Sequence, residues 1–271
     1  RGERGPGMSR NPYQTFPVEI LAIRPETEID WTFRVAWNRP VLGGQFLELS
    51  LPGIGEGPIS VSDFGDGWLD LTIRRVGILT NAIHALKAGD SLQVRGSYGN
   101  GWPLAEFAGR HLIVAAGGTG LAPVKSVVRT FAEHPEKASR FDLLAGFKSP
   151  ADILFREELA AWSRSARVSV TVDKGDAAWT GSVGLITAFI PPLEIPDLSN
   201  VAVLVVGPPP MMKFSAIEFL RRGIPEERLW LSFERRMQCG IGKCGHCKID
   251  ETYVCLEGPV FPYAKAKQLI D

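Results

Sequence analysis

The residues best suited to chemistry in this sequence are four cysteines near its C-terminal end, in the stretch MQCGIGKCGHCKIDETYVCLEGPVF. Their spacing is C-x4-C-x2-C, followed after seven residues by the fourth cysteine: Cys239, Cys244, Cys247 and Cys255. Structural zinc usually draws on two C-x2-C-like pairs, and only one such pair is present. The C-x4-C-x2-C triplet is typical of the plant-type [2Fe–2S] loop, in which the fourth cysteine arrives separately. The spacing therefore favours a [2Fe–2S] cluster, with zinc and disulfides as the alternatives.

Glycines inside this stretch support a loop wrapped around a cluster. Gly240, Gly242 and Gly245 let the backbone fold closely and direct amides towards sulfur. We expect His246 to lie outside the ligand set, because four thiolates already complete it. The fourth cysteine returns much sooner than in plant ferredoxins.

Two glycine-rich turns further upstream are candidates for binding a dinucleotide. LIVAAGGTGLAPVKS places Gly117, Gly118 and Gly120 between an apolar run and a helical pattern, where backbone amides can bind a pyrophosphate. The spacing is not GxGxxG, so a tight strand-to-helix turn is the alternative. The second turn is GPPPMM, residues 207–212, in the stretch VVGPPPMM. It ends a later strand that we expect in the same sheet. Ligands of such sheets bind beyond the carboxyl ends of the strands, so the two turns reinforce each other.

A third candidate site lies in the N-terminal half, in GPISVSD and IRRVGILT. Ser60 and Thr80 offer hydroxyls, and Arg74 and Arg75 offer cations beside the small Gly77, a combination that suits a phosphate-bearing cofactor. The alternative is a solvated strand edge. The sequence has no H-E-x-x-H or G-x-S-x-G motif and its four histidines lie in unrelated contexts, so the chemistry is expected to belong to cofactors.

The elements that must position these residues change in type along the chain. Up to about residue 108, short stretches such as WTFRVAW and LDLTIRR alternate large apolar with smaller or polar residues, which predicts an antiparallel β-barrel. From about residue 109, buried runs alternate with helical patterns, which predicts a parallel α/β sheet. We therefore expect a flexible start or cloning remnant, a barrel, a Rossmann-like α/β domain and a small cysteine module, in residues 1–12, 13–108, 109–232 and 233–271.

Composition limits the partners and the setting. Lys plus Arg and Asp plus Glu both number 30, which gives no strong field for nucleic acid or an anionic membrane. No apolar run reaches the ~20 residues of a membrane span, and no signal peptide is recognisable. A cytoplasmic protein is expected, and cytosolic thiols are normally reduced, which weakens the disulfide alternative.

The order of these parts resembles the ferredoxin–NADP reductase superfamily. Within it, the chain is similar to the branch with a C-terminal [2Fe–2S] module: dihydroorotate dehydrogenase electron-transfer subunits, γ subunits of cytoplasmic NiFe hydrogenases and, most closely, B subunits of anaerobic sulfite reductases. The resemblance extends from about residue 13 almost to the end. It is carried by GEGPISVSDFGDGW, RGSYGNGWP, VAAGGTGLAPVKS, VVGPPPMM and ERRMQCGIGKCGHCKI with YVCLEGPVF.

The resemblance implies FAD, NADH or NADPH, and a [2Fe–2S] cluster as cofactors. The residues that match the family's flavin strand and its ribityl and pyrophosphate contacts are Pro58, Ile59, Ser60, Arg74, Arg75, Val76, Gly77, Leu79 and Thr80. Those that match the nicotinamide-dinucleotide site are Gly117, Gly118, Thr119, Gly120, Gly207, Pro208 and Met211, and the four cysteines match the cluster ligands.

The sequence departs from the family pattern at two positions. Gly57 stands where related dihydroorotate dehydrogenase subunits have an arginine before the flavin strand, so Arg74 or Arg75 is expected to supply the phosphate charge. Val206 stands where many plant-type reductases have a cysteine, so no thiol is expected at the nicotinamide. No clear cluster for a 2′-phosphate follows FDLLAGF, although Lys148 and Arg164 could serve, and NADH is expected.

The resemblance implies an NAD(P)H:acceptor oxidoreductase subunit that passes electrons through FAD and the cluster to partner subunits. The expected partners are an iron–sulfur subunit and a sirohaem-type subunit of an anaerobic sulfite reductase, which converts sulfite to sulfide. One alternative is an electron-transfer subunit for a cytoplasmic hydrogenase or dihydroorotate dehydrogenase. A non-enzyme alternative is a nucleotide-sensing module with a structural metal.

Overall fold

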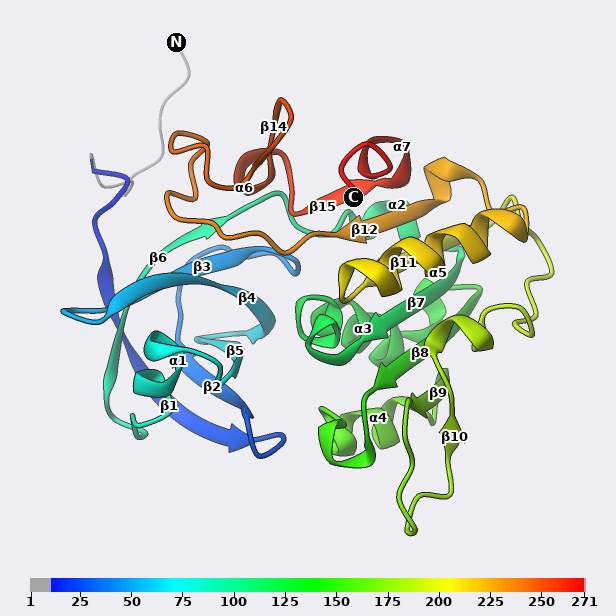
Figure 1. The fold of residues 1–271 in the computed structure, drawn as a ribbon, viewed down its shortest axis with the longest axis horizontal. Coiled ribbons are helices and arrows are strands. Elements are labelled where there is room, and N and C mark those ends of the chain that lie inside the picture. The colour runs from blue at the N-terminus through cyan, green and yellow to red at the C-terminus, as the bar shows by residue number, and fades with distance from the viewer. Residues whose placement is uncertain (1–10, 271) are drawn as a thin grey trace.

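The computed structural model describes residues 11–270 of the chain. Most of the expected flexible start, residues 1–10, lies outside the described residues. The described chain forms a barrel, an α/β sheet and a cysteine-bearing segment that lies across both (Figure 1). This is the order of folds that the sequence predicts.

The N-terminal half forms a closed six-stranded barrel with strand order β1-β2-β5-β4-β3-β6, on the left of Figure 1. Alternation in the sequence explains it, because Leu69, Leu71 and Ile73 point into the barrel core and are fully buried. Two short helices follow β5 and β6. The bounds are β1 (Phe16–Pro25), β2 (Asp30–Ala36), β3 (Phe46–Leu51), β4 (Gly55–Gly65), β5 (Trp68–Arg74), α1 (Ile78–Ile83), β6 (Ser91–Tyr98) and α2 (Leu104–Phe107).

The second half forms a seven-stranded sheet in the order β10-β9-β8-β7-β11-β12-β15. All neighbours are parallel except β12 and β15. The central strand β7 is buried along its whole length, as expected of a strand covered on both faces. The bounds are β7 (His111–Gly117), β8 (Arg140–Phe147), β9 (Arg167–Val172), β10 (Ser182–Val183), β11 (Val201–Val206), β12 (Leu229–Ser232) and β15 (Val260–Pro262).

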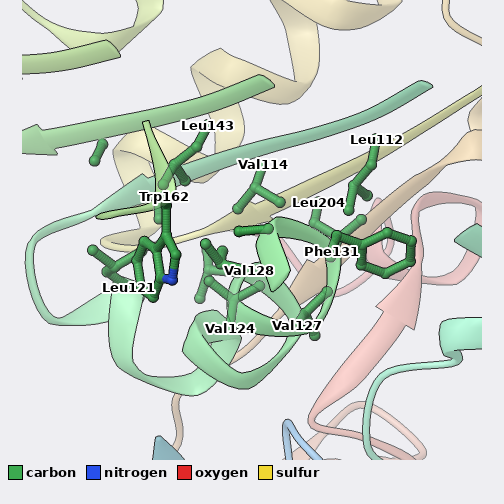
Figure 2. Packing of buried hydrophobic residues seen from close by; sticks show 14 of the residues in the cluster. Leu112, Val114, Leu121, Val124, Val127, Val128, Phe131, Leu143, Trp162 and Leu204 are labelled. Atoms are coloured by element: carbon green, nitrogen blue, oxygen red, sulfur yellow. The ribbon is translucent and has the colours of Figure 1, made fainter. Parts of the chain in front are cut away.

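Helices cover both faces of this sheet. Leu112 and Val114 of β7 pack in one core with α3 and α4, whereas Ile113 and Ala115 pack in the other core with α5. Figure 2 shows the first core, with Val124, Val127 and Phe131 under the strands. The bounds are α3 (Lys125–Glu133), α4 (Arg156–Trp162), α5 (Pro209–Arg221) and the 3₁₀ turns η1 (Gly118–Val124), η2 (Pro135–Lys137), η3 (Pro150–Asp152), η4 (Ile186–Phe189) and η5 (Glu226–Arg228).

The cysteine-bearing segment is tied to the sheet by its own strand. It contains β13 (Lys248–Ile249), β14 (Thr252–Tyr253), α6 (Val254–Glu257), β15 and α7 (Tyr263–Ala266). β15 adds to the edge of the sheet by pairing antiparallel with β12. In Figure 1 this segment, orange to red, crosses above β3 and β6 of the barrel before it reaches the sheet.

Charged side chains join the barrel to the first helices of the sheet. The Nε–H of Arg129 donates a bifurcated hydrogen bond to both carboxylate oxygens of Asp63 on β4, at 2.9 and 3.0 Å, and Asp63 lies 3.7 Å from Lys125 Nζ. Lys125 Nζ also lies 3.2 Å from Glu158 Oε1, which accepts a hydrogen bond from Arg24 of β1. Glu158 of α4 is therefore placed between one cation from each half of the molecule.

Replacing Glu158 by Gln tests how much this contact holds the two halves together. Burial raises the pKa of the Glu158 carboxyl, but Lys125 and Arg24 outweigh burial and hold the pKa below its ordinary value of 4.5. A depressed carboxyl pKa stabilises the fold above the unfolded-state pKa, and this stabilisation is lost as the pH falls through the folded-state pKa. We expect E158Q to lower the melting temperature at pH 7 by roughly 2–8 °C, and the difference to shrink below about pH 4.5.

The measurement is thermal denaturation of both proteins between pH 3.5 and 7. E157Q is the matched control, since Glu157 is the exposed neighbour on the same helix. A difference between E158Q and wild type that does not change with pH would contradict the role of the carboxylate.

Candidate functional site

A cavity of about 550 Å³ lies at the carboxyl ends of the parallel strands. Its walls come from the residues that follow β7, β8, β9 and β11, and from Arg74 at the end of barrel strand β5. This is the edge at which open α/β sheets bind their ligands. Among the residues expected at the dinucleotide site, those that line the cavity are Gly117, Gly118, Thr119, Pro208 and Met211.

The other two expected residues, Gly120 and Gly207, bring the two turns together beneath the cavity. A Cβ on Gly120 would lie 2.6 Å from the carbonyl oxygen of Val206 and 2.7 Å from Cα of Gly207. A Cβ on Gly117 would lie 2.4 Å from Sδ of Met211. Gly120 is therefore needed for backbone to pack on backbone, whereas Gly117 leaves room for the Met211 side chain. Gly118, at φ +55°, has open space where a Cβ would be.

The charged residues of the cavity bear on the choice of dinucleotide. Three carboxylates line it, from Asp152, Asp173 and Glu218, together with the cations Lys148 and Arg74. The Arg74 guanidinium is held by Asp30, with Nε to Oδ1 at 2.8 Å and Nη2 to Oδ2 at 2.9 Å. Arg164, which the sequence also nominates, is not among the lining residues, because it lies beyond the end of α4.

The residues expected to bind the flavin lie on β4 and in the turn from β5 to α1. Pro58, Ile59 and Ser60 are half-buried on β4, opposite Glu48, Leu47 and Phe46 of β3. β4 packs against η1, the turn that begins with Gly118 and forms part of the cavity. A cofactor held on β4 would therefore lie beside a dinucleotide held in the cavity.

The turn after β5 presents a cation and exposed apolar side chains. Thr80 Oγ1 accepts hydrogen bonds of 3.0 Å from the amides of Val76 and Gly77, which fixes the turn. Arg75 is exposed, and Val76 and Ile78 are 73% and 81% exposed. Exposed apolar side chains beside a cation fit a cofactor with a flat ring system and a phosphate.

Gly57, where related chains have an arginine, faces this turn. A Cβ on Gly57 would lie 3.3 Å from Cδ2 of Leu79, so a side chain there would require a small shift of Leu79. Arg74 is paired with Asp30, whereas Arg75 is exposed. Of the two nominated arginines, Arg74 lines the cavity and Arg75 has the more exposed side chain.

The four cysteines lie around one loop whose amides point at their sulfurs. Cys239, Cys247 and Cys255 are buried and Cys244 is exposed. Cys239 Sγ accepts hydrogen bonds from the amides of Lys243 at 3.3 Å, and of Ile241 and Cys244 at 3.5 Å. The amide of Gly242 donates to Cys255 Sγ at 3.2 Å, and the amide of Cys255 donates to Cys247 Sγ at 3.4 Å.

Positive φ at the loop glycines makes this arrangement possible. Gly240, Gly242 and Gly245 have φ of +72°, +67° and +77°, which L side chains rarely adopt. The amide bonds also act on the thiols. Burial opposes ionisation of Cys239, but the amides of Cys244, Ile241 and Lys243 outweigh it and lower its pKa to about 6. The opposite holds at Cys255, where burial and the neighbouring Cys247 raise the pKa to about 12. The loop therefore favours the thiolate, the form that binds metal, at Cys239.

The cysteine side chains interact in two pairs, Cys239 with Cys244 and Cys247 with Cys255. In residues 11–270, no group of three or more His, Cys, Asp or Glu side chains is arranged to hold a single metal ion. His246 is exposed and its amide donates to Cys244 Sγ at 3.5 Å.

Sequence reasoning assigned no role to the barrel residues that receive the cysteine segment. Arg95 Nη1 donates to the carbonyl of Cys239 at 2.6 Å, and the ring of Tyr98 packs against Gly240. Asn100 Nδ2 donates to the carbonyls of Val260 at 2.8 Å and Glu257 at 3.0 Å. The sequence feature that could have indicated these contacts is the segment RGSYGNGWP, which is rich in glycine and in hydrogen-bonding side chains.

Known protein families match the sheet and the cysteine segment separately. Residues 114–216 match the oxidoreductase NAD-binding domain. Residues 234–267 match the iron–sulfur cluster binding domain of dihydroorotate dehydrogenase B. In the described part of the chain, no helix is long and apolar enough to span a membrane.

Relatives match nearly the whole chain. The γ subunit of sulfhydrogenase 1 from Pyrococcus furiosus is 35% identical, covering 93% of this chain and 92% of that protein. A probable dihydroorotate dehydrogenase B (NAD(+)) electron transfer subunit from Methanothermobacter thermautotrophicus is 35% identical, covering 90% and 87%. The structure of an NADH-dependent reduced ferredoxin-NADP oxidoreductase has a TM-score of 0.76 at 23% identity, covering 95% and 94% of the two chains, and so shares the fold.

Replacing Gly120 by Ala tests the packing of the two turns. The added methyl group would lie 2.6 Å from the Val206 carbonyl, so one turn must move away from the other. We expect roughly a tenfold or greater loss of NADH affinity, because a site built by two turns loses its geometry when they separate. Fluorescence titration with NADH gives the affinity, and flavin and iron content should stay at wild-type levels.

G109A controls for loss of stability alone. Gly109 has φ +75° but open space around it, and it precedes β7 at the opposite end from the cavity. G109A should lower the melting temperature and leave NADH affinity unchanged. Equal affinity losses in G120A and G109A would contradict the role of the turns.

Proposed function

We propose that this chain, which belongs to the ferredoxin–NADP reductase superfamily, links NADH oxidation to a partner enzyme of the hydrogenase type. Its relatives include hydrogenase γ subunits and dihydroorotate dehydrogenase B electron-transfer subunits. It is an NAD(P)H-dependent electron-transfer subunit with an iron–sulfur domain. The observation that carries the proposal is that β4, the proposed flavin strand, packs against η1 beside the cavity and is joined through Glu56 and Arg95 to the cysteine loop.

The bound cofactors supply the redox chemistry: the flavin exchanges two electrons with the nicotinamide, and the cluster carries one electron at a time. The protein chain itself binds and orients these cofactors. The glycine turns give the backbone amides of Gly117–Thr119 access to the dinucleotide pyrophosphate, and Pro208 and Met211 bound the nicotinamide end. Gly120 and Gly207 keep the two turns in contact.

Pro58, Ile59 and Ser60 and the turn of Arg75 to Thr80 would hold the flavin, and Arg75 would supply positive charge for its phosphate. Arg74 stays paired with Asp30 at the cavity wall. The thiolates of Cys239, Cys244, Cys247 and Cys255 would hold the cluster. Among them, Cys244 is the exposed cysteine.

The identity of the partner rests on the relatives. Two Pyrococcus furiosus sulfhydrogenase γ subunits, 35% and 34% identical, support a hydrogenase partner. They support it more directly than the sulfite-reducing iron–sulfur and sirohaem subunits that the sequence leads us to expect. Purification of the complex from its native cells identifies the partner, and a partner with sirohaem or with dihydroorotate-oxidising activity would contradict this proposal.

The visible spectrum of the purified chain and the variant C247S test the electron path. The wild type should show flavin and cluster absorbance that bleach with NADH. C247S should keep NADH oxidation by a dye that takes electrons from flavin, and lose at least about 90% of electron transfer to the partner, because the cluster lacks a ligand. A colourless zinc-containing protein, or equal loss of both activities in C247S, would contradict the proposal.

The carboxylates of the cavity support NADH over NADPH. Asp173 directly follows β9 and lines the cavity, so its charge opposes a 2′-phosphate. We expect D173N to improve kcat/KM for NADPH about tenfold and to change that for NADH much less, since about 1.4 kcal/mol corresponds to tenfold. Steady-state rates with both dinucleotides give the ratio.

D176N is the matched control for D173N. Asp176 is exposed in the same loop and is not a lining residue of the cavity. A wild type that prefers NADPH, or a D176N variant that changes the ratio as much as D173N, would contradict this assignment.

A further inference from the structure

Arg95 is a buried cation on the outer face of the barrel. It lies on β6 between Val94, which packs inside the barrel, and Gly96, and its side chain is only 3% exposed. Burying a guanidinium is costly unless its charge and its N–H groups are paired. The partners of Arg95 are therefore informative.

The Arg95 guanidinium spreads its donors over two separate parts of the chain. Its Nη1 donates to the carbonyl of Cys239 at 2.6 Å, and its Nη2 donates to the carbonyl of Gln238. On the barrel side its Nε lies 3.0 Å from Glu56 Oε2, its Nη2 contacts Glu56 Oε1, and its Nη1 donates to Tyr98 Oη at 3.2 Å.

These partners belong to the elements proposed to hold two different cofactors. Glu56 lies on β4, two residues before Pro58 of the proposed flavin strand. Cys239 is the first proposed cluster ligand, and its neighbour Gly240 packs against the ring of Tyr98, 2.7 Å from the position of a Cβ. A single side chain thus joins the strand of one cofactor to the loop of the other.

A second acidic residue beside Arg95, Glu48, is buried but does not hydrogen-bond to it. Glu48 of β3 stands opposite both Pro58 and Arg95 in the barrel, is fully buried, and neither of its carboxyl oxygens has a hydrogen-bond partner. Burial raises the pKa of Glu48 to about 8, against the opposing effect of Arg95. Glu56, and not Glu48, is the carboxylate that hydrogen-bonds to Arg95.

We propose that Arg95 is a positioning residue that fixes the Gln238–Cys239 backbone against β4, and so sets the place of the cluster relative to the flavin. This rests on the proposed function. Arginine suits the task because its planar fork can serve a carboxylate and two carbonyls at once, which the single ammonium of lysine cannot do.

The test compares R95Q, R95K and E56Q with the wild-type holoprotein. R34Q is the control, since Arg34 makes a comparable two-point pair with Asp70 on the barrel, at 2.7 and 2.9 Å, without contacting the cysteine segment. Hydrogen–deuterium exchange of residues 238–247 reports how firmly the loop is held. The electron paramagnetic resonance spectrum of the reduced cluster reports its surroundings.

We expect R95Q to speed exchange in residues 238–247 about fivefold or more, because loss of about 1 kcal/mol of hydrogen bonding opens the loop by that factor. Its resonance spectrum should broaden or shift. R95K should fall between R95Q and wild type, and R34Q should match wild type in both measurements.

Wild-type exchange and an unchanged spectrum in R95Q would overturn the proposal. So would equal effects in R34Q, which would show a general loss of stability. If R95Q does not fold, E56Q decides by the same criteria, since it frees Arg95 from β4. A wild type without any cluster signal contradicts the proposed function instead, so the two failures are distinguishable.

Discussion

The hydrogen bonds of Asn100 hold the three parts of the chain in one arrangement. Asn100 lies in the link between the last barrel strand and the first sheet strand. Its amide donates to the carbonyl of Gly258, and its side chain bonds to the backbone of Glu257 and Val260. Because β15 begins at Val260 and pairs with β12, one side chain fixes the cysteine segment to both neighbours.

This constraint explains why the proposed sites lie so close together. The segment is anchored at the link, its cysteine loop is bonded to Arg95 of β6, and β4 packs against the turn η1 of the sheet. Two glycines allow close contacts in this arrangement: Gly120 packs against the backbone of Val206 and Gly207, and Gly240 packs against the ring of Tyr98.

Local patterns made the fold and the cysteine loop predictable. Leu69, Leu71 and Ile73 alternate in sequence because a barrel strand has one inner face, and the C-x4-C-x2-C spacing belongs to a single continuous loop. The expected FAD, dinucleotide and cluster folds agree with the families and structures that match the chain. The individual contacts of each cofactor stay predictions.

The residues that sequence reasoning missed depend on partners far along the chain. Arg95 donates hydrogen bonds to the carbonyls of Gln238 and Cys239, which lie 143 and 144 positions away in the sequence. The sequence of its own strand therefore does not indicate these contacts. A glutamate in the strand sequence FLELSL would ordinarily face solvent. Glu48 is nevertheless fully buried, because the cysteine segment packs on its side of β3, where Phe46 shares a core with Cys239. Arg164 was nominated as a cation that could bind a 2′-phosphate. It is not a lining residue of the cavity, because it lies beyond the end of α4, and the sequence alone does not show this.

The short strand β15 also limits how the protein associates with other chains. An uncovered β12 would offer a row of free amides and carbonyls to any extended peptide, and β15 occupies that row with three residues that end in Pro262. Proline has no amide hydrogen to extend the ladder, and the opposite edge is the two-residue strand β10. Assembly by strand addition is thus discouraged at both edges of the sheet, which leaves side-chain surfaces and loops as the contact regions.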